Sequence, residues 1–121
     1  MDPVTAPTLF VVLSDVTAAH EDEFNRWYDE EHVPERLSAP GFLRATRYRA
    51  VPELPGGATV QGEAQAPRYL AIYEVSGPEA LQTDEYRRQI ANHTEWTRRT
   101  QEHMQVKVRH TYQRMGDVRL P

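Results

Sequence analysis

Two segments with the length of β-strands are apolar on both of their faces. In "TLFVVLSDV" (residues 8–16), odd-numbered and even-numbered positions alike are apolar from Leu9 to Leu13. The segment "RYLAIYEV" (residues 68–75) has the same character. Successive side chains of a strand point to opposite faces, so such a strand must be covered on both sides. This requirement is the strongest constraint that the sequence places on the fold.

The other periodic segments predict two helices and two further strands. The predicted elements are a helix over residues 19–32, a strand over 42–51, a helix in two pieces over 77–96 and a strand over 104–115. Pro34 is expected to end or kink the first helix, and Thr83 can cap the second piece of the second helix. In the last strand, alternation assigns one face to Val106, Val108, His110 and Tyr112.

The order of these elements is β-α-β-β-α-β, which is the ferredoxin-like arrangement of the α+β class. It predicts a single domain over residues 1–121, with a long surface loop at residues 52–67. Both helices would lie on one face of an antiparallel sheet. The second face would then be apolar and bare, and a second copy of the chain is the simplest cover for it. We therefore expect a homodimer.

Composition excludes several classes of protein and of site. The chain has 14 basic and 18 acidic residues and no Lys/Arg block, which argues against nucleic-acid binding. It has no cysteine, so disulfides and thiolate nucleophiles are excluded. The first residues have neither a basic segment nor a long apolar run, so neither a signal peptide nor membrane insertion is expected and the cytoplasm is the expected location. Five scattered histidines predict no metal site, and no cofactor motif is present.

The segment "FNRWYDEEHVPERLSAPGFLRATRY" (residues 24–48) resembles the EthD-like group of the dimeric α/β-barrel superfamily. The matching pattern is W-Y-x-x-x-H-x-P on a helix, then a "PGF" turn and a strand with "TRY". "RYLAIYEV" and "TDEYRR" are also similar to that group, so the resemblance covers residues 8–115. It implies a dimer and a cleft between helices and sheet, lined by a histidine that maps onto His32. Relatives include cofactor-free isomerases, cyclases and monooxygenases, and haem-degrading enzymes.

His32 is the first candidate for catalysis, because its pKa near neutrality suits general acid–base chemistry. It shares a helix face with Phe24, Trp27 and Tyr28. The alternative is a buried histidine that only holds the helix end. Glu31 could orient the imidazole, or it could belong to a solvated acidic face.

Arg47, Tyr48 and Tyr73 are the candidates for stabilising a developing oxyanion. Arg47 and Tyr48 are adjacent on a strand, so only one of them can face the cleft. For Arg47, a salt bridge at the rim or at a dimer interface is the alternative. Tyr73 is the predicted hydroxyl donor of the third strand.

The predicted ligand-contacting residues are Trp27, Tyr28, Tyr48, Tyr86, His93 and Trp96. His93 would lie at the cleft mouth opposite His32, and the aromatic residues would form apolar walls. Plain core packing is the alternative for the aromatic residues, and a surface position is the alternative for His93. His110 is expected in the core or in the dimer interface, and His20 and His103 are expected to be exposed.

These features together predict a small cofactor-independent enzyme of the isomerase, cyclase or lyase type. His32 would transfer a proton on a small hydrophobic or aromatic carbonyl compound, with Arg47 and Tyr73 beside it. One alternative is a cofactor-free monooxygenase or a haem-handling protein, with His93 as axial ligand. The other alternative is a dimer that binds a small ligand or has a structural role, without catalysis.

Overall fold

The computed structural model describes residues 8–57 and 66–118. Its antiparallel sheet has the strand order β2-β3-β1-β4. The strands are β1 (Thr8–Val16), β2 (Phe42–Arg49), β3 (Tyr69–Val75) and β4 (Met104–Gln113). The middle of the predicted loop 52–67 lies outside the described residues.

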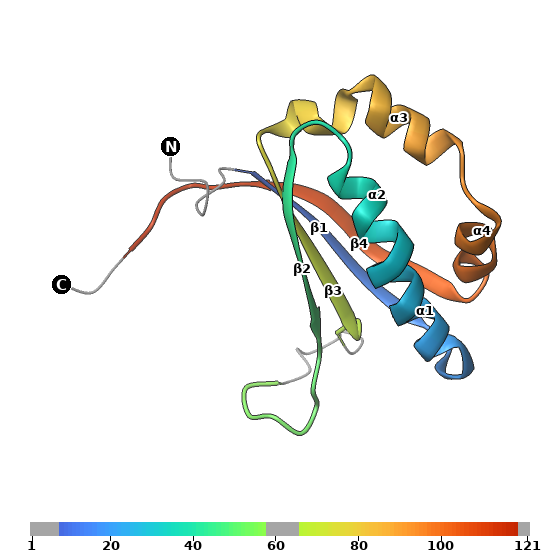
Figure 1. Cartoon of the computed structure of the whole chain (residues 1–121). Helices are drawn as coiled ribbons and strands as arrows, with labels where there is room; N and C mark the ends of the chain where they lie inside the picture. Colours follow the sequence, from blue (N-terminus) through green and yellow to red (C-terminus); the bar gives the residue numbers. More distant parts are fainter. Residues whose placement is uncertain (1–7, 58–65, 119–121) are drawn as a thin grey trace.

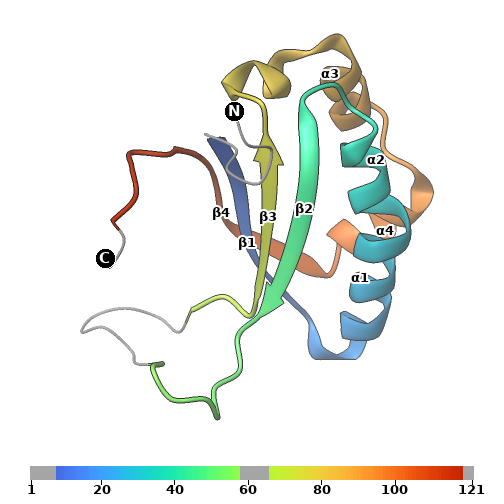
Figure 2. The same cartoon turned by 60° about the vertical axis from the view of Figure 1, so that its left-hand side comes forward.

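The helical segments lie on one face of the sheet (Figures 1 and 2). They are η2 (Ala18–His20), α1 (Glu21–Trp27), η3 (Tyr28–His32), α2 (Val33–Leu37), η4 (Pro78–Gln82), α3 (Asp84–Ala91) and α4 (Glu95–Gln101). The hydroxyl of Thr83 accepts the N–H of Tyr86 at 3.1 Å and so caps α3, as expected. The ferredoxin-like fold predicted from the element order is confirmed. No helix among the described residues is long and apolar enough to cross a membrane.

Pro34 bends the first helical region instead of ending it. The segment η3 that precedes it is a π-helical turn, in which the N–H of Val33 bonds to the carbonyl of Tyr28, five residues earlier. A proline inside a helix has no N–H to donate, and its ring crowds the carbonyl four residues before it, here that of Glu30. The wider π turn accommodates the proline, and helical structure continues to Leu37.

The "PGF" turn places the start of β2 against η4. Gly41 has a φ of 89°, a conformation that L side chains rarely adopt. A Cβ atom at Gly41 would also lie 2.7 Å from the Cβ of Ala80. The carbonyl of Gly41 accepts a hydrogen bond from the N–H of Ser76 at 2.8 Å. Glycine is therefore required here both for the backbone conformation and for the close approach of η4.

The hydrophobic core lies between the sheet and the helices. Alternate residues of β1 and β3 are buried under the helices, which explains one of the two apolar faces of these strands. The core consists of Phe10, Val12, Phe24, Trp27, Tyr28, Ala39, Phe42, Tyr69, Ala71, Tyr73, Val75 and Ala80.

A β-bulge in β4 changes which of its side chains face the helices. Leu13 pairs with Val108, but the next residue of β1, Ser14, pairs with Val106, so Lys107 is an extra residue in β4. Val106 therefore shares the helix-facing side with Ser14, while Val108 lies on the other side. The prediction that Val106 and Val108 share a face is wrong, because simple alternation does not allow for the bulge.

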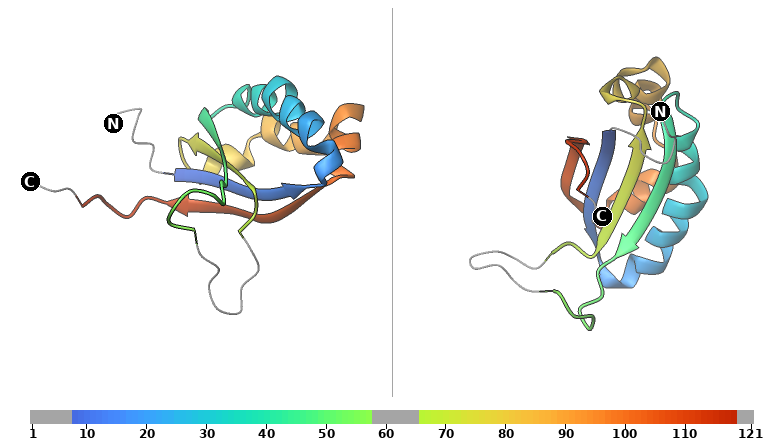
Figure 3. Two further views of the ribbon diagram at one scale, coloured as in Figure 1. Left: turned by 90° about the horizontal axis from the view of Figure 1, so that it is seen from below. Right: turned by 90° about the vertical axis from the view of Figure 1, so that its left-hand side faces the viewer.

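The second face of the sheet is apolar and no described element covers it (Figure 3). Leu9, Val11 and Leu13 of β1 are only partly buried there, as are Leu70 and Ile72 of β3. The predicted two-sided apolar character of these strands is thus present, with one side covered within the chain and the other side open.

Candidate active site between the helices and the sheet

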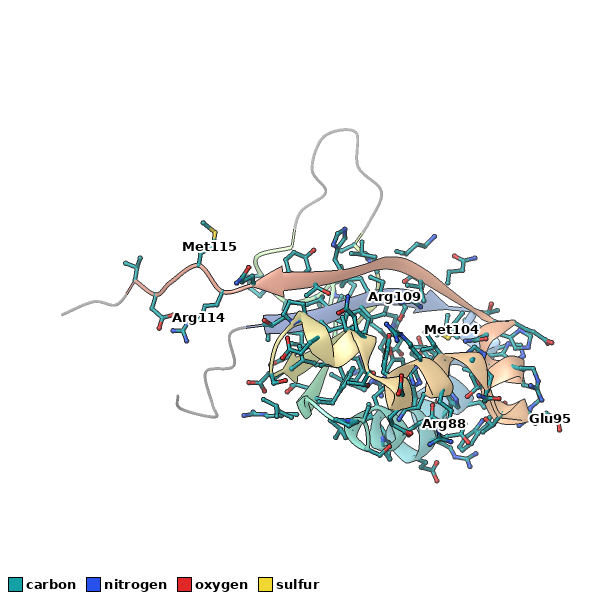
Figure 4. The ribbon with its side chains drawn as sticks, turned by 90° about the horizontal axis from the view of Figure 1, so that it is seen from above. Arg88, Glu95, Met104, Arg109, Arg114 and Met115 are labelled. Atoms are coloured by element: carbon teal, nitrogen blue, oxygen red, sulfur yellow. The ribbon has the colours of Figure 1, made fainter. Side chains whose placement is uncertain are left out.

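A cavity of about 450 Å³ lies between the helices and the sheet. It is lined by Phe10, Val12, Trp27, Tyr28, His32, Arg36, Tyr73, Tyr86, Ile90, His93, Gln101, Met104, Val106 and Arg109. Cavities of a few hundred Å³ with apolar walls and a few polar groups are typical of small-molecule sites. Figure 4 shows Met104 and Arg109 on β4, which contributes one side of the cavity.

The π turn fixes the position of the His32 ring. The imidazole stacks on Trp27 with ring centroids 4.4 Å apart, and it meets the edge of Tyr28 at 5.0 Å. Trp27 and His32 are five residues apart, the same separation as residues joined by a hydrogen bond in a π-helix. In a regular α-helix that spacing would separate the two side chains by about 140° around the axis. The π turn therefore creates the stack that holds His32 against the cavity.

The surroundings of His32 keep its imidazole neutral. Burial is the largest cause, followed by the positive charges of Arg36 and Arg109, and together they lower the pKa of His32 to about 3. The ring makes no hydrogen bond to any other residue in the described part of the chain. A neutral imidazole with no hydrogen-bond partner can accept a proton from a molecule in the cavity.

Tyr73 places a hydroxyl in the same cavity. Its side chain is 1% exposed, and its hydroxyl has no hydrogen-bond partner of acceptable geometry among the described residues. Burial raises the pKa of Tyr73, and the neighbouring Tyr28 phenol adds to this effect. Burial also raises the pKa of Tyr28. Both phenols are therefore neutral at pH 7. A buried hydroxyl without a partner is rare, and one that lines a cavity is suited to donate a hydrogen bond to a ligand.

Two arginines that line the cavity were not among the candidates from the sequence. Arg36 is buried, donates to Glu35 at 3.2 Å and to Gln89 at 2.9 Å, and lies over the ring of Tyr86. It follows His32 by four residues, a spacing that puts two side chains on the same side of a helix, so the sequence did contain a signal for it. Arg109 faces the helices opposite Val12.

Arg47 faces the helices but does not line the cavity. Its guanidinium donates to Asp29 at 2.9 Å and to Asn25 at 2.7 Å, and it lies 4.3 Å from the ring centroid of Tyr28. This geometry matches the alternative prediction, in which Arg47 forms a salt bridge at the rim. Because Arg47 does not line the cavity, its position gives no support to the prediction that it contacts substrate. Its charge still acts on the cavity, because it contributes to the lowered pKa of His32.

Two of the predicted ligand-contacting residues lie elsewhere. Tyr48 pairs with Leu70, faces the open side of the sheet and is 54% exposed, so strand parity excludes it from the cavity. Trp96 packs against the core beneath Arg26 and does not line the cavity either. The other four predicted contacts do line it: Trp27, Tyr28, Tyr86 and His93.

Glu31 holds the helices together and does not orient His32. Its carboxylate accepts hydrogen bonds from the hydroxyls of Thr94 at 2.8 Å and Thr97 at 3.1 Å. The Thr97 hydroxyl in turn accepts the indole N–H of Trp27 at 3.0 Å. This network docks the start of α4 on the first helical region, and so fixes one wall of the cavity.

The remaining histidines lie outside the main cavity. His20 and His103 were expected to be exposed, but both are partly buried and their rings stack with centroids 3.4 Å apart. They line a second cavity of about 180 Å³, together with Thr100. His110 is exposed on the open side of the sheet. Residues 8–57 and 66–118 contain no group of three or more His, Asp or Glu placed to hold a metal ion.

Comparison with solved structures supports the fold. HapK from Hahella chejuensis superposes with a TM-score of 0.59 at 11% identity, over 94% of this chain and 98% of its own. An ethyl tert-butyl ether D (EthD) family protein from Bacillus halodurans gives 0.52 at 17% identity, over 89% and 97%. At these identities the likeness concerns the fold alone, and at that level the resemblance to the EthD-like group is confirmed.

Two further solved structures share the fold. A dimeric ferredoxin-like protein from an uncultured marine organism gives a TM-score of 0.54 at 16% identity, over 99% of this chain and 96% of its own. The haem degrader MhuD from Mycobacterium tuberculosis, solved with two haems in its active site, gives 0.52 at 18% identity, over 93% and 99%.

Sequence comparison assigns the family. No curated protein sequence matches this chain. Residues 8–115 match the family described as "Domain of unknown function (DUF4286)", a range that runs from the start of β1 to beyond the end of β4. The chain therefore belongs to the DUF4286 family and has a ferredoxin-like fold.

Proposed function

We propose that this protein is a small cofactor-independent enzyme that uses His32 to transfer a proton on a small hydrophobic or aromatic carbonyl compound. One observation carries the proposal. The imidazole of His32 and the hydroxyl of Tyr73 both line one cavity, and neither makes a hydrogen bond of good geometry with another described residue, although the Tyr28 phenol lies beside Tyr73. A base and a neutral donor that are not used by the fold are what enolisation of a carbonyl compound requires.

The reaction would begin when His32 accepts a proton from the carbon next to the carbonyl group. The electrons of the broken C–H bond form an enolate, whose oxygen accepts a hydrogen bond from Tyr73. The positive charge of Arg36 stabilises that oxygen through the low-dielectric cavity. The imidazolium then returns its proton to another carbon, which completes an isomerisation, or to a leaving group, which completes an elimination.

The surroundings of His32 make protonation of its ring less costly in the transition state than in the empty cavity. The imidazolium form of His32 is disfavoured when the cavity is empty, because of burial and of the nearby arginines. When an enolate forms, its negative charge offsets those arginines, so the cost of charging the ring falls as the reaction proceeds. Interactions that strengthen toward the transition state are the ones that raise the rate of the chemical step.

A homodimer is part of the proposal. The open side of the sheet carries partly buried Leu9, Val11, Leu13, Leu70 and Ile72, which a second copy of the sheet would cover. The dimeric ferredoxin-like protein of the same fold supports this assembly.

A test of the proposal is hydrogen exchange at carbon. β-Tetralone is an aromatic ketone small enough for the cavity, and its loss of α-proton signal in D₂O can be followed by NMR. We expect the protein to accelerate exchange and His32→Asn to lower that rate by about 10² or more. His103→Asn, which changes a histidine of the second cavity, is the matched control and should leave the rate unchanged. Equal rates for the protein and for His32→Asn would contradict catalysis by His32 and favour a non-catalytic binding protein.

The haem-handling alternative has one observation in its favour. His93 lines the cavity, and a haem degrader is among the proteins with this fold. Haem bound through that imidazole would supply an iron centre for oxidative chemistry. A Soret band that shifts on mixing with haem and is lost in His93→Ala would support it. An unshifted band would leave proton transfer as the function of the cavity.

A further inference from the structure

The lining of the main cavity has an unusual charge balance for this chain. The protein carries a net charge of -4, with 18 acidic side chains. The cavity is lined by two arginines and two histidines and by no aspartate or glutamate. A concave site lined by one sign of charge concentrates ions of the opposite sign.

We propose that the cavity recognises an anionic substrate that carries a carboxylate, with Arg109 as the residue that binds the carboxylate. The inference rests on the proposed function, because it names the class of substrate for the same site. Under it, the reacting carbonyl meets His32 and Tyr73, and the carboxylate meets the guanidinium of Arg109.

Arg109 differs from the other arginines of the chain. Among residues 8–57 and 66–118, nine arginines form salt bridges with carboxylates, including Arg36 of the cavity, which pairs with Glu35. The guanidinium of Arg109 makes no hydrogen bond and no ion pair with any residue in the part of the chain that the structure describes. Arg49 shares this property but lies outside the cavity lining. Arg109 is therefore the cavity cation whose charge is not compensated within the fold.

The guanidinium of Arg109 is accessible to an anionic ligand. Arg109 is exposed, so water solvates its charge while the cavity is empty, and no carboxylate of the described residues pairs with it. Its charge acts through space on His32 and contributes to the low pKa of that ring. A bound carboxylate would supply the bidentate partner that the planar guanidinium fits best.

The register of the sheet sets the length of the substrate. Tyr73 pairs with Phe10 on one side of β1, and Arg109 pairs with Val12 on the other side. Two strand spacings of about 4.8 Å across the sheet and two residues of about 3.4 Å along β1 therefore separate their backbones, about 12 Å in all. The carboxylate would thus lie several bonds away from the reacting carbonyl, on an elongated, largely apolar molecule.

Calorimetric titration with a pair of matched probes tests the inference. 2-Naphthoate and 2-naphthamide have nearly the same shape and differ in charge, and neither has a C–H that the proposed reaction could act on. We expect the full-length protein to bind naphthoate at least tenfold more tightly than naphthamide. Arg109→Gln should remove this preference by weakening naphthoate about tenfold, with little change for naphthamide. Arg49→Gln, the other unpaired strand arginine, should keep the preference.

Three results would overturn the inference: equal affinity for the two probes, an unchanged preference in Arg109→Gln, or no binding of naphthoate at millimolar concentration. Failure of the proposed function would look different. In that case the protein would still prefer naphthoate, and Arg109→Gln would still remove the preference. The His32→Asn variant, however, would catalyse exchange of the β-tetralone protons as fast as the unmodified protein does.

Discussion

At the scale of single residues, the most informative groups are those that the fold leaves without partners. Most buried polar groups of this protein are satisfied, as in the network of Glu31, Thr97 and Trp27. The hydroxyl of Tyr73 is an exception, and it shares its cavity with the ring of His32, which makes no hydrogen bond to another described residue. Such groups cost stability unless something binds them, so their presence together is a physical reason to place the function there.

Two tyrosines of β3 provide a matched test of this view. Both Tyr69 and Tyr73 are buried and face the helices. We expect Tyr73→Phe to leave the free energy of unfolding unchanged or slightly higher, because its hydroxyl has no partner to lose. The rate of proton exchange should fall by about 10²-fold, the usual effect of removing an oxyanion donor.

Tyr69→Phe should behave in the opposite way. The Tyr69 hydroxyl accepts the side-chain N–H of Asn25 at 3.2 Å. Its removal should lower the free energy of unfolding by about 1 kcal/mol and leave the exchange rate unaltered. Urea titrations and exchange rates of the two variants provide the comparison. A large loss of stability in Tyr73→Phe would mean that its hydroxyl is bonded within the fold.

The candidate site was partly predictable from the sequence at this scale. His32, Trp27 and Tyr28 follow from one helical stripe, and Tyr73 from its place in an apolar strand. The choice between Arg47 and Tyr48 was not predictable, because alternation gives opposite faces but does not say which face the helices cover. Arg109 was missed for a related reason. The face on which its side chain lies depends on its pairing with Val12 of β1, and the sequence does not reveal that pairing.

At the scale of elements, irregularities in regular structure place the functional side chains. The π turn of η3 brings His32 onto Trp27, and the bulge at Lys107 sets the face of β4 on which Val106 lies. The helix around residues 19–32 was predictable from its period, whereas the π turn was not. A single proline indicates a kink or an end, but not which hydrogen-bond pattern accommodates it.

The docking of α4 can be tested with two threonines one turn apart. Thr97 and Thr100 are both buried, but only the Thr97 hydroxyl has hydrogen-bond partners in the described part of the chain, Trp27 and Glu31 among them. We expect Thr97→Val to lower the free energy of unfolding by about 1–3 kcal/mol, because it leaves the indole N–H without a partner and removes one of the two hydrogen bonds to the Glu31 carboxylate. Thr100→Val should be neutral or slightly stabilising. Equal losses for the two variants in denaturant titrations would contradict this account of how α4 is held.

At the scale of the whole molecule, the open side of the sheet decides the assembly. The strand order, the antiparallel sheet and the two-sided apolar strands were all predictable, because they depend on element order and on period. Cover of the second face by a second copy of the chain remains a prediction.

Light scattering tests the assembly. We expect the protein to have a mass of twice 14.0 kDa at micromolar concentration. Ile72→Lys places a charge in the middle of the open side, next to Val11, and should give the monomer mass. Leu54→Lys, at an exposed position outside the sheet, should leave the dimer intact. A monomer mass for the unmodified protein would contradict the proposed dimer.

We propose that His32 is a neutral base facing a cationic cavity, and an NMR titration of its ring measures that protonation state. Burial and nearby positive charge both disfavour the protonated ring, so the pKa shift is downward, to about 3. In ¹⁵N-labelled protein, the His32 ring should therefore stay neutral from pH 8 to pH 4.5, and Arg109→Gln should raise its midpoint. A midpoint near the ordinary value of 6.5, unchanged in Arg109→Gln, would contradict the account.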